Sequence, residues 1–113
     1  MTLPQFPNVF YGSALLHGGT PAPAGMTVTA VISRFNADER HYALTITHQG
    51  LFGSGHGLKL KVGGDSDIPH LTVIEFFITD RPLEMETERS PAGHAHFYAD
   101  ANPHVTRIVL CQD

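Results

Sequence analysis

Histidine is the residue type in this chain with the clearest capacity for chemistry, because the 113 residues include eight of them. Two, His94 and His96, are separated by a single residue in a segment where polar and apolar side chains alternate. In a β-strand that spacing places both imidazoles on one face, roughly 6 to 7 Å apart, where the pair can share one Zn²⁺ or Cu²⁺ ion. The pattern therefore raises the hypothesis of a small metal-binding protein.

A metal site of this kind needs a third ligand, and the sequence offers two sources for it. One is His104. The other is a row of alternating glutamates, Glu84, Glu86 and Glu88. This row could also bind Ca²⁺ with the help of loop carbonyls, but its simpler interpretation is a short, exposed edge strand kept soluble by charge. Because a His-x-His pattern without a fixed third ligand is weak, we interpret the two histidines as part of a polar strand face and assign no metal ligand.

The glycine-rich residues 49–57 have the composition of a phosphate-binding or nucleophile loop but lack the residues that either loop requires. A phosphate-binding loop ends in Lys followed by Ser or Thr and leads into a helix, whereas His56 and Gly57 lead into a predicted strand. A nucleophile elbow has glycine two residues before its serine, and here Phe52 stands two residues before Ser54. The segment is therefore predicted to be a hairpin turn in which glycine supplies positive φ angles.

Two further arrangements could support catalysis, and neither is favoured. His70 and Glu75 are predicted to lie on one strand an odd number of residues apart, so their side chains would point to opposite sides of the sheet. Cys111 has no His or Cys at catalytic spacing beside it and is interpreted as a buried or fraying structural cysteine. We therefore assign no catalytic and no cofactor-binding residue and expect that the protein is not an enzyme. An active site formed between subunits is the least favoured alternative.

The length and charge of the chain exclude several classes of protein. At 113 residues and 12.3 kDa, residues 1–113 are expected to form a single domain. Seven Lys and Arg against eleven Asp and Glu give a net charge of −4, and the scattered cations argue against a nucleic-acid partner. The single cysteine forms no intrachain disulfide, so the hydrophobic core must hold the fold.

The sequence shows no membrane span and no export signal. No apolar run reaches the ~20 residues needed to cross a bilayer. The first residues, Met-Thr-Leu-Pro-Gln, lack the charged-then-apolar plan of a signal peptide. The chain is therefore expected to be cytoplasmic, or extracellular at a cell surface if it is a fragment of a longer exported protein.

Apolar and polar residues alternate with a period of two in most of the segments that Gly, Pro, Asn and Asp separate. This pattern is typical of half-buried antiparallel strands, and about seven or eight of them predict an all-β fold, an antiparallel β-sandwich. The expected strands are residues 9–16, 26–33, 42–47, 58–62, 71–78, 84–88, 94–99 and 105–110. In the second, third and fourth of these, the side chains expected to face the core are Met26, Val28, Ala30, Ile32, Tyr42, Leu44, Ile46, Leu58, Leu60 and Val62. Residues 17–25, rich in Gly and Pro, are expected to form a loop.

Several short motifs follow one another in a recognisable order. The run Phe10-Tyr11-Gly12 precedes Gly19, a Pro-Ala-Pro-Ala-Gly run and an alternating strand from Thr27. Further along come Gly50-Leu51-Phe52-Gly53, the strand at 58–62 and the run Ile74-Glu75-Phe76-Phe77-Ile78. Over most of its length the chain thus resembles the immunoglobulin-like modules of archaeal and bacterial cell-surface proteins. The resemblance implies an immunoglobulin-like sandwich that acts as a non-catalytic surface, adhesion or carbohydrate-associated module, and it implies no particular binding residues.

The predicted strand at residues 71–78 is apolar on both faces. Its core-facing side chains are expected to be Ile74, Phe76 and Ile78. A second apolar stripe, on the opposite face, consists of Leu71, Val73 and Phe77, and Val31 and Val109 are expected to extend it. Because one face of a sandwich strand normally meets water, this stripe predicts a packing interface with another subunit, a neighbouring domain or a long loop.

The sequence therefore predicts a non-catalytic binding, adhesion or packing module. Its expected partner is a protein or carbohydrate surface, or a second copy held through the Leu71, Val73 and Phe77 stripe. Recognition in sandwiches is commonly carried by loops at the ends of the sheets. The ligand-facing loops are expected at residues 18–25, 49–57 and 91–94.

Overall fold

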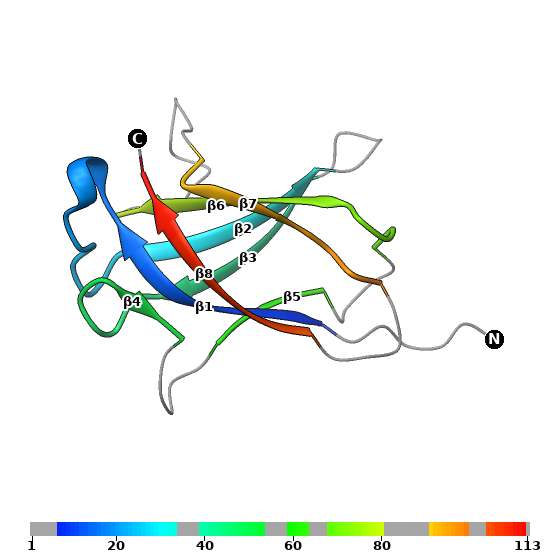
Figure 1. Cartoon of the computed structure of the whole chain (residues 1–113), viewed down its shortest axis with the longest axis horizontal. Coiled ribbons are helices and arrows are strands. Elements are labelled where there is room, and N and C mark those ends of the chain that lie inside the picture. The colour runs from blue at the N-terminus through cyan, green and yellow to red at the C-terminus, as the bar shows by residue number, and fades with distance from the viewer. Residues whose placement is uncertain are drawn as a thin grey trace.

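The computed structural model describes residues 7–33, 39–53, 59–63, 68–80, 91–99 and 104–112, without the side chains of Ser33 and Glu39. These ranges contain eight strands, one single-turn 3-10 helix and no α-helix (Figure 1). The elements are β1 (Asn8–Leu15), η1 (His17–Gly19), β2 (Thr27–Ser33), β3 (Glu39–Thr45), β4 (Leu51–Phe52), β5 (Leu60–Val62), β6 (Val73–Thr79), β7 (Gly93–His96) and β8 (His104–Cys111). The prediction of an all-β chain is confirmed, and the strand predicted at residues 84–88 lies outside the described residues. No helix in these ranges has the length and apolar character needed to cross a bilayer.

The strands form two sheets of four strands each. One sheet has the order β3-β2-β6-β7 and is antiparallel throughout. In the other, β8 pairs in parallel with β1 over its whole length, so β4 and β5 share the remaining edge of β1, both antiparallel. In Figure 1 the blue arrow of β1 and the red arrow of β8 point the same way, and these two strands are the parallel pair.

The expectation of a purely antiparallel fold is therefore wrong for one sheet. Parallel neighbours need a long crossover connection, which a hairpin cannot provide. Here the connection from β1 to β8 includes the entire second sheet. The first and last strands of the chain are thereby joined by eight register pairs, from Asn8 opposite His104 to Leu15 opposite Cys111.

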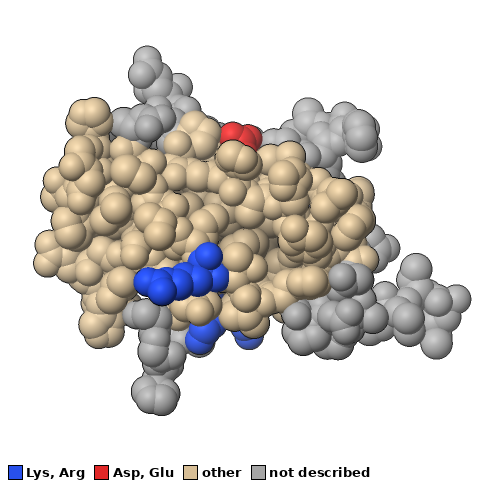
Figure 2. All heavy atoms as spheres, in the orientation of Figure 1, with Lys and Arg blue, Asp and Glu red and all other residues tan. Residues whose placement is uncertain are grey.

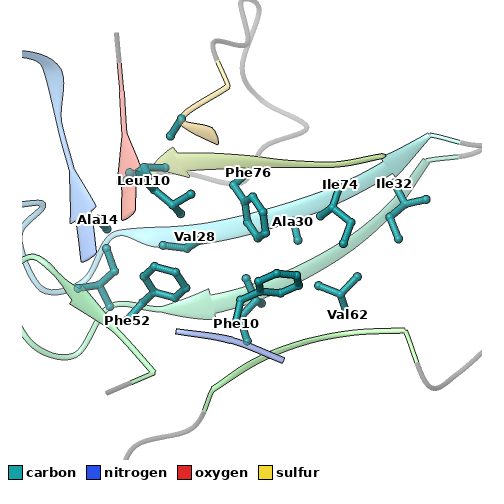
Figure 3. Close-up of a cluster of buried hydrophobic side chains, with 14 of the residues drawn as sticks. Phe10, Ala14, Val28, Ala30, Ile32, Phe52, Val62, Ile74, Phe76 and Leu110 are labelled. Atoms are coloured by element: carbon teal, nitrogen blue, oxygen red, sulfur yellow. The ribbon is translucent and has the colours of Figure 1, made fainter. Parts of the chain in front are cut away.

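The two sheets pack face to face around one main hydrophobic core (Figure 3). Phe10 of β1 and Phe76 of β6 meet across the layers, with ring centroids 5.1 Å apart and an interplanar angle of 72°. The predicted inward residues are confirmed where the structure describes them: Val28, Ala30, Ile32, Ile46, Leu60 and Val62 are buried, and Met26, Tyr42 and Leu44 are half-buried against them. Leu58 lies outside the described residues.

Two departures from the predicted boundaries occur where the segments before β6 and after β7 meet without forming a ladder. Leu71 was expected to open a strand, but its φ of +66° is incompatible with one, and the strand begins at Val73. Its N–H donates to the carbonyl oxygen of Phe97 at 2.6 Å, and the N–H of Phe97 donates to that of Thr72 at 2.8 Å. These bonds end β7 at His96, three residues earlier than predicted.

Two small elements lie inside segments that were predicted to be irregular. The loop at residues 17–25 begins with the single turn η1, in which Gly18 has a φ of +81°. The predicted turn at residues 49–57 contains the two-residue strand β4, which pairs with β1. Both are too short to leave a periodic signal in the sequence.

Asn8 is a buried polar residue that ties β1 to the segment after β7. Its Nδ2 donates to the carbonyl oxygen of Tyr98 at 3.1 Å, and its Oδ1 accepts the N–H of Tyr98 at 2.9 Å. The side-chain amide of Asn8 thus provides hydrogen-bond partners for the backbone N–H and C=O of Tyr98, which belongs to no strand. These two bonds also provide partners for the buried amide itself. The irregular end of β7 is fixed in place by this pair of bonds.

Candidate functional site

His94 and His96 lie on β7, at the edge of the antiparallel sheet, and both side chains are exposed. Ala95 between them packs against the core, so the prediction that the two imidazoles share one face is confirmed. In the register of the sheet, Glu75 of β6 stands directly opposite His94. Residues directly opposite in an antiparallel pair share a face, so a carboxylate lies on the same surface as the two histidines.

The described residues do not complete the metal site that this surface suggests. Within the described ranges, no three His, Cys, Asp or Glu side chains converge closely enough to hold a metal ion. His104, proposed as a third ligand, begins β8 in the other sheet and stacks on Tyr98, with ring centroids 5.0 Å apart. Glu84, Glu86 and Glu88, the other proposed source, lie outside the described residues.

His70 has a position different from the predicted one, and Cys111 matches only one of the two interpretations given for it. His70 lies in a turn before β6 rather than on the strand with Glu75, and its Nδ1 accepts the N–H of Ala99 at 3.1 Å. The prediction that the side chains of His70 and Glu75 point to opposite sides of one strand therefore does not apply. Cys111 is exposed, because odd-numbered residues of β8 face outward. The buried interpretation is therefore wrong, whereas the position of Cys111 as the last residue of β8 is consistent with the alternative of a cysteine at a fraying strand end.

The predicted ligand-facing loops are partly brought together. The N–H of Gly50 donates to the carbonyl oxygen of Ala22 at 2.7 Å, which joins the loop at residues 18–25 to the one that begins at residue 49. Gly50 and Gly53 have φ angles of +74° and +66°, as the turn interpretation requires. Pro91 and Ala92 instead lie beside the carboxyl-terminal end of β8, where the N–H of Cys111 donates to the carbonyl oxygen of Ala92 at 2.9 Å.

The predicted apolar stripe is divided in the structure. Phe77 and Val31, with 6% and 3% of their surfaces exposed, form a small buried cluster of their own on the outer side of the antiparallel sheet. Leu71 and Val73 are about half exposed at 52% and 49%. Val109 lies on β8 in the other sheet and therefore does not extend the stripe. The alternation of side chains shows which residues of one strand share a face, but it does not show which sheet that strand joins.

The outer face of the other sheet carries a group of side chains that sequence reasoning did not connect. We call it the β1–β8 face, and it consists of Val9, Tyr11, Ser13, Leu51, Lys59, Lys61, Val105, Arg107 and Val109. In the register of the sheet, Lys61, Val9 and Val105 form one row across three strands. Arg107 stands beside Tyr11 in the next row. The Nζ atom of Lys59 lies over the Tyr11 ring, 5.7 Å from its centroid.

The β1–β8 face is both cationic and apolar. Arg107 and Lys61 are exposed and Lys59 is half-buried, while none of the described Asp or Glu residues belongs to this surface. Val105 and Val109, on either side of Arg107 along β8, are each 60% exposed. In Figure 2, which views the molecule from the side of β1 and β8, blue Lys and Arg atoms lie across the lower part of the surface and at its lower edge, and the visible acidic atoms lie at the upper rim.

Such a face can attract and hold an anionic partner. Three cations on one surface attract carboxylates, and a Lys placed over a Tyr ring is held in position by a cation-π contact. The exposed valines add apolar area that a solvated partner would cover. The sequence signal that could have revealed this face is the spacing by two of Lys59 and Lys61 and of Val105, Arg107 and Val109.

Comparisons of the chain with family models, with curated proteins and with solved structures found no match.

Proposed function

We propose that this chain is a non-catalytic, immunoglobulin-like β-sandwich module that binds a carboxylate-bearing partner on its β1–β8 face. The observation that carries the proposal is the register that places Arg107, Tyr11 and Lys61 on one exposed surface, with Lys59 over the tyrosine ring. Side chains far apart in the sequence are gathered there by strand pairing alone.

Two features support the immunoglobulin-like part of the proposal. The chain forms two packed sheets from short strands, and its last strand returns to lie beside its first. Long connections that move the chain between the two sheets are a feature of immunoglobulin-like and related sandwiches. The motif Phe10-Tyr11-Gly12, the first of the series that carries the family resemblance, lies near the centre of this pairing.

The positions of the charged groups support a binding role rather than a catalytic one. Catalytic groups act in sites that exclude water, where electrostatic interactions are strong. Lys61 and Arg107 lie instead on the open surface of a sheet, where each ion pair contributes about 0.2 to 1 kcal/mol. Several weak contacts on a broad surface are suited to binding a polymer or a protein surface.

A binding measurement with two anionic polymers tests the proposal. The probes are poly-L-glutamate and polygalacturonate, which carry the same anionic group on different backbones, and neutral dextran is the reference. We expect at least one of the anionic polymers to bind with an affinity that falls as salt is added, because exposed charges are screened. Fluorescence anisotropy of the labelled polymers measures the dissociation constants.

Matched variants show whether the β1–β8 face is responsible. Lys61→Gln with Arg107→Gln removes two positive charges from the face, and Ala43→Glu with Thr45→Glu lowers the net charge equally on exposed positions of β3 in the other sheet. We expect the first pair to weaken binding about threefold to tenfold and the second to change it less than twofold, since the lost contacts are local. Equal losses in both double variants would contradict the proposed surface.

A second candidate function is metal binding at His94 and His96, which the opposite position of Glu75 favours. Imidazole and carboxylate groups are both ligands that Zn²⁺ takes. Within the described ranges these three side chains do not converge on one point, so binding would require them to move together. If this surface binds metal, the untagged protein holds about one Zn²⁺ per chain, and His94→Ala with His96→Ala abolishes the binding. Zinc titration measured by calorimetry decides the question, and retention of the ion by the double variant would dismiss these ligands.

A further inference from the structure

The outer edge of β8 carries backbone groups that the described strands do not use. Within the described ranges, β8 forms a ladder with β1 only. The N–H of Gln112 donates to the carbonyl oxygen of Leu15 on β1 at 2.8 Å. The N–H of Cys111 points to the side away from β1 and donates to the carbonyl oxygen of Ala92 at 2.9 Å. Because the backbone alternates with a period of two, the N–H and C=O groups of Val105, Arg107 and Val109 point to the same outer side as those of Cys111.

The side chains along this edge leave it accessible. Val105 and Val109 are each 60% exposed, and Arg107 between them is exposed too. An edge strand with unpaired backbone groups is a template for pairing with another strand unless proline, a bulge or inward charge prevents it. β8 contains no proline, and its eight residues pair with β1 without a bulge. The single charge, Arg107, therefore decides what can add to this edge.

A second copy of this chain fits the edge poorly. An antiparallel pairing of two β8 strands centred on Arg107 would place this residue opposite Arg107 of the other copy, and any register would join two cationic faces. Like charges directly opposite one another destabilise a strand pair. A segment that presents a carboxylate opposite Arg107 would gain a charge-assisted contact at the same position.

We propose that an extended, carboxylate-bearing polypeptide segment adds to β8 as an antiparallel strand. The proposal rests on the function proposed above and names the partner of that same face. In the register that follows, an apolar residue of the segment stands opposite Val105, a Glu or Asp opposite Arg107 and an apolar residue opposite Val109. The rows of the sheet then continue from the segment through β8 to Val9, Tyr11 and Ser13 of β1. Main-chain hydrogen bonds supply affinity, and the side-chain rows supply specificity.

The test uses one peptide in three forms. Its sequence is Thr-Val-Ser-Glu-Ser-Val-Thr with blocked ends, so that Val, Glu and Val stand opposite Val109, Arg107 and Val105. In the first methylated form, these three residues carry N-methyl groups, which block the amides that face β8 in an antiparallel pair. In the second, the two Ser residues and the final Thr are methylated, and the amides that face β8 stay free.

We expect the first methylated peptide to bind the intact protein about tenfold or more weakly than the unmodified one, and the second to bind within about twofold of it. Arg107→Gln should weaken the unmodified peptide severalfold, and a peptide with Gln in place of Glu should lose the same factor. Dissociation constants follow from amide shifts in an NMR titration.

Equal binding of both methylated peptides would overturn strand addition. If poly-L-glutamate or polygalacturonate still binds the face in that case, the proposed function stands and only this inference fails. If neither the peptide nor the two polymers bind, both fail. Binding of polygalacturonate alone would also overturn the inference, because it would identify the partner as a carbohydrate.

Discussion

Replacing Gly12 by alanine is expected to lower the free energy of unfolding by about 4 kcal/mol or more, a large part of what a domain of this size has. Gly12 lies in the middle of β1 with a φ of +146°, and a Cβ atom there would overlap the backbone carbonyl oxygen of Ile108 on β8. That oxygen belongs to the strand paired with β1 and cannot move away without opening the sheet. The substitution therefore combines a disfavoured backbone conformation with a clash against a fixed atom.

Gly25 provides the matched control. Its φ is +100°, but a Cβ atom added there would meet nothing within 4 Å. Gly25→Ala should therefore cost only the backbone strain, about 1 kcal/mol. Urea unfolding followed by circular dichroism measures both values, and soluble expression reports on Gly12→Ala if it does not fold. Similar losses in the two variants would mean that β8 does not lie against Gly12 as described.

Replacing Phe76 by alanine is expected to lower the free energy of unfolding by about 3 to 5 kcal/mol. The Phe76 side chain is fully buried, and its ring meets Phe10 edge to face from the opposite sheet. Because the two residues join the layers, Phe10→Ala and the double variant should reveal a coupling of about 0.5 to 1.5 kcal/mol.

Leu51→Ala is the control for this series, because Leu51 is 40% exposed on β4 and the substitution should cost only about 1 kcal/mol. Urea unfolding measures the four free energies that the cycle needs. Strictly additive losses for Phe10 and Phe76 would show that the rings do not meet, which would place the two sheets differently from Figure 3.

The alternation of side chains along each strand could be predicted from sequence because it is a local property. Val28, Ala30 and Ile32 face the core since every second residue of a strand points the same way. The boundaries at Leu71 and Phe97 could not be predicted in this way. They depend on hydrogen bonds between residues far apart in the chain. The positive φ of Leu71 is uncommon for a residue other than glycine, so its residue type does not signal a turn there.

The candidate face could be predicted only in its parts. That Val105, Arg107 and Val109 share one side of a strand follows from their spacing, as does the shared face of His94 and His96. That Arg107 stands beside Tyr11 depends on a parallel pairing between the two ends of the chain, and no local pattern specifies such a register. The amide of Asn8 is a similar case, because its partner Tyr98 lies 90 positions away.

An NMR titration of the isotope-labelled protein with poly-L-glutamate tests the proposed surface most directly. The amides of Val9, Tyr11, Val105, Arg107 and Val109 are expected to shift as the polymer is added and to return as salt is raised, because all five residues belong to the β1–β8 face. Shifts confined to the β3-β2-β6-β7 sheet, or to the loops at residues 18–25 and 49–53, would contradict the assignment of this face as the binding surface.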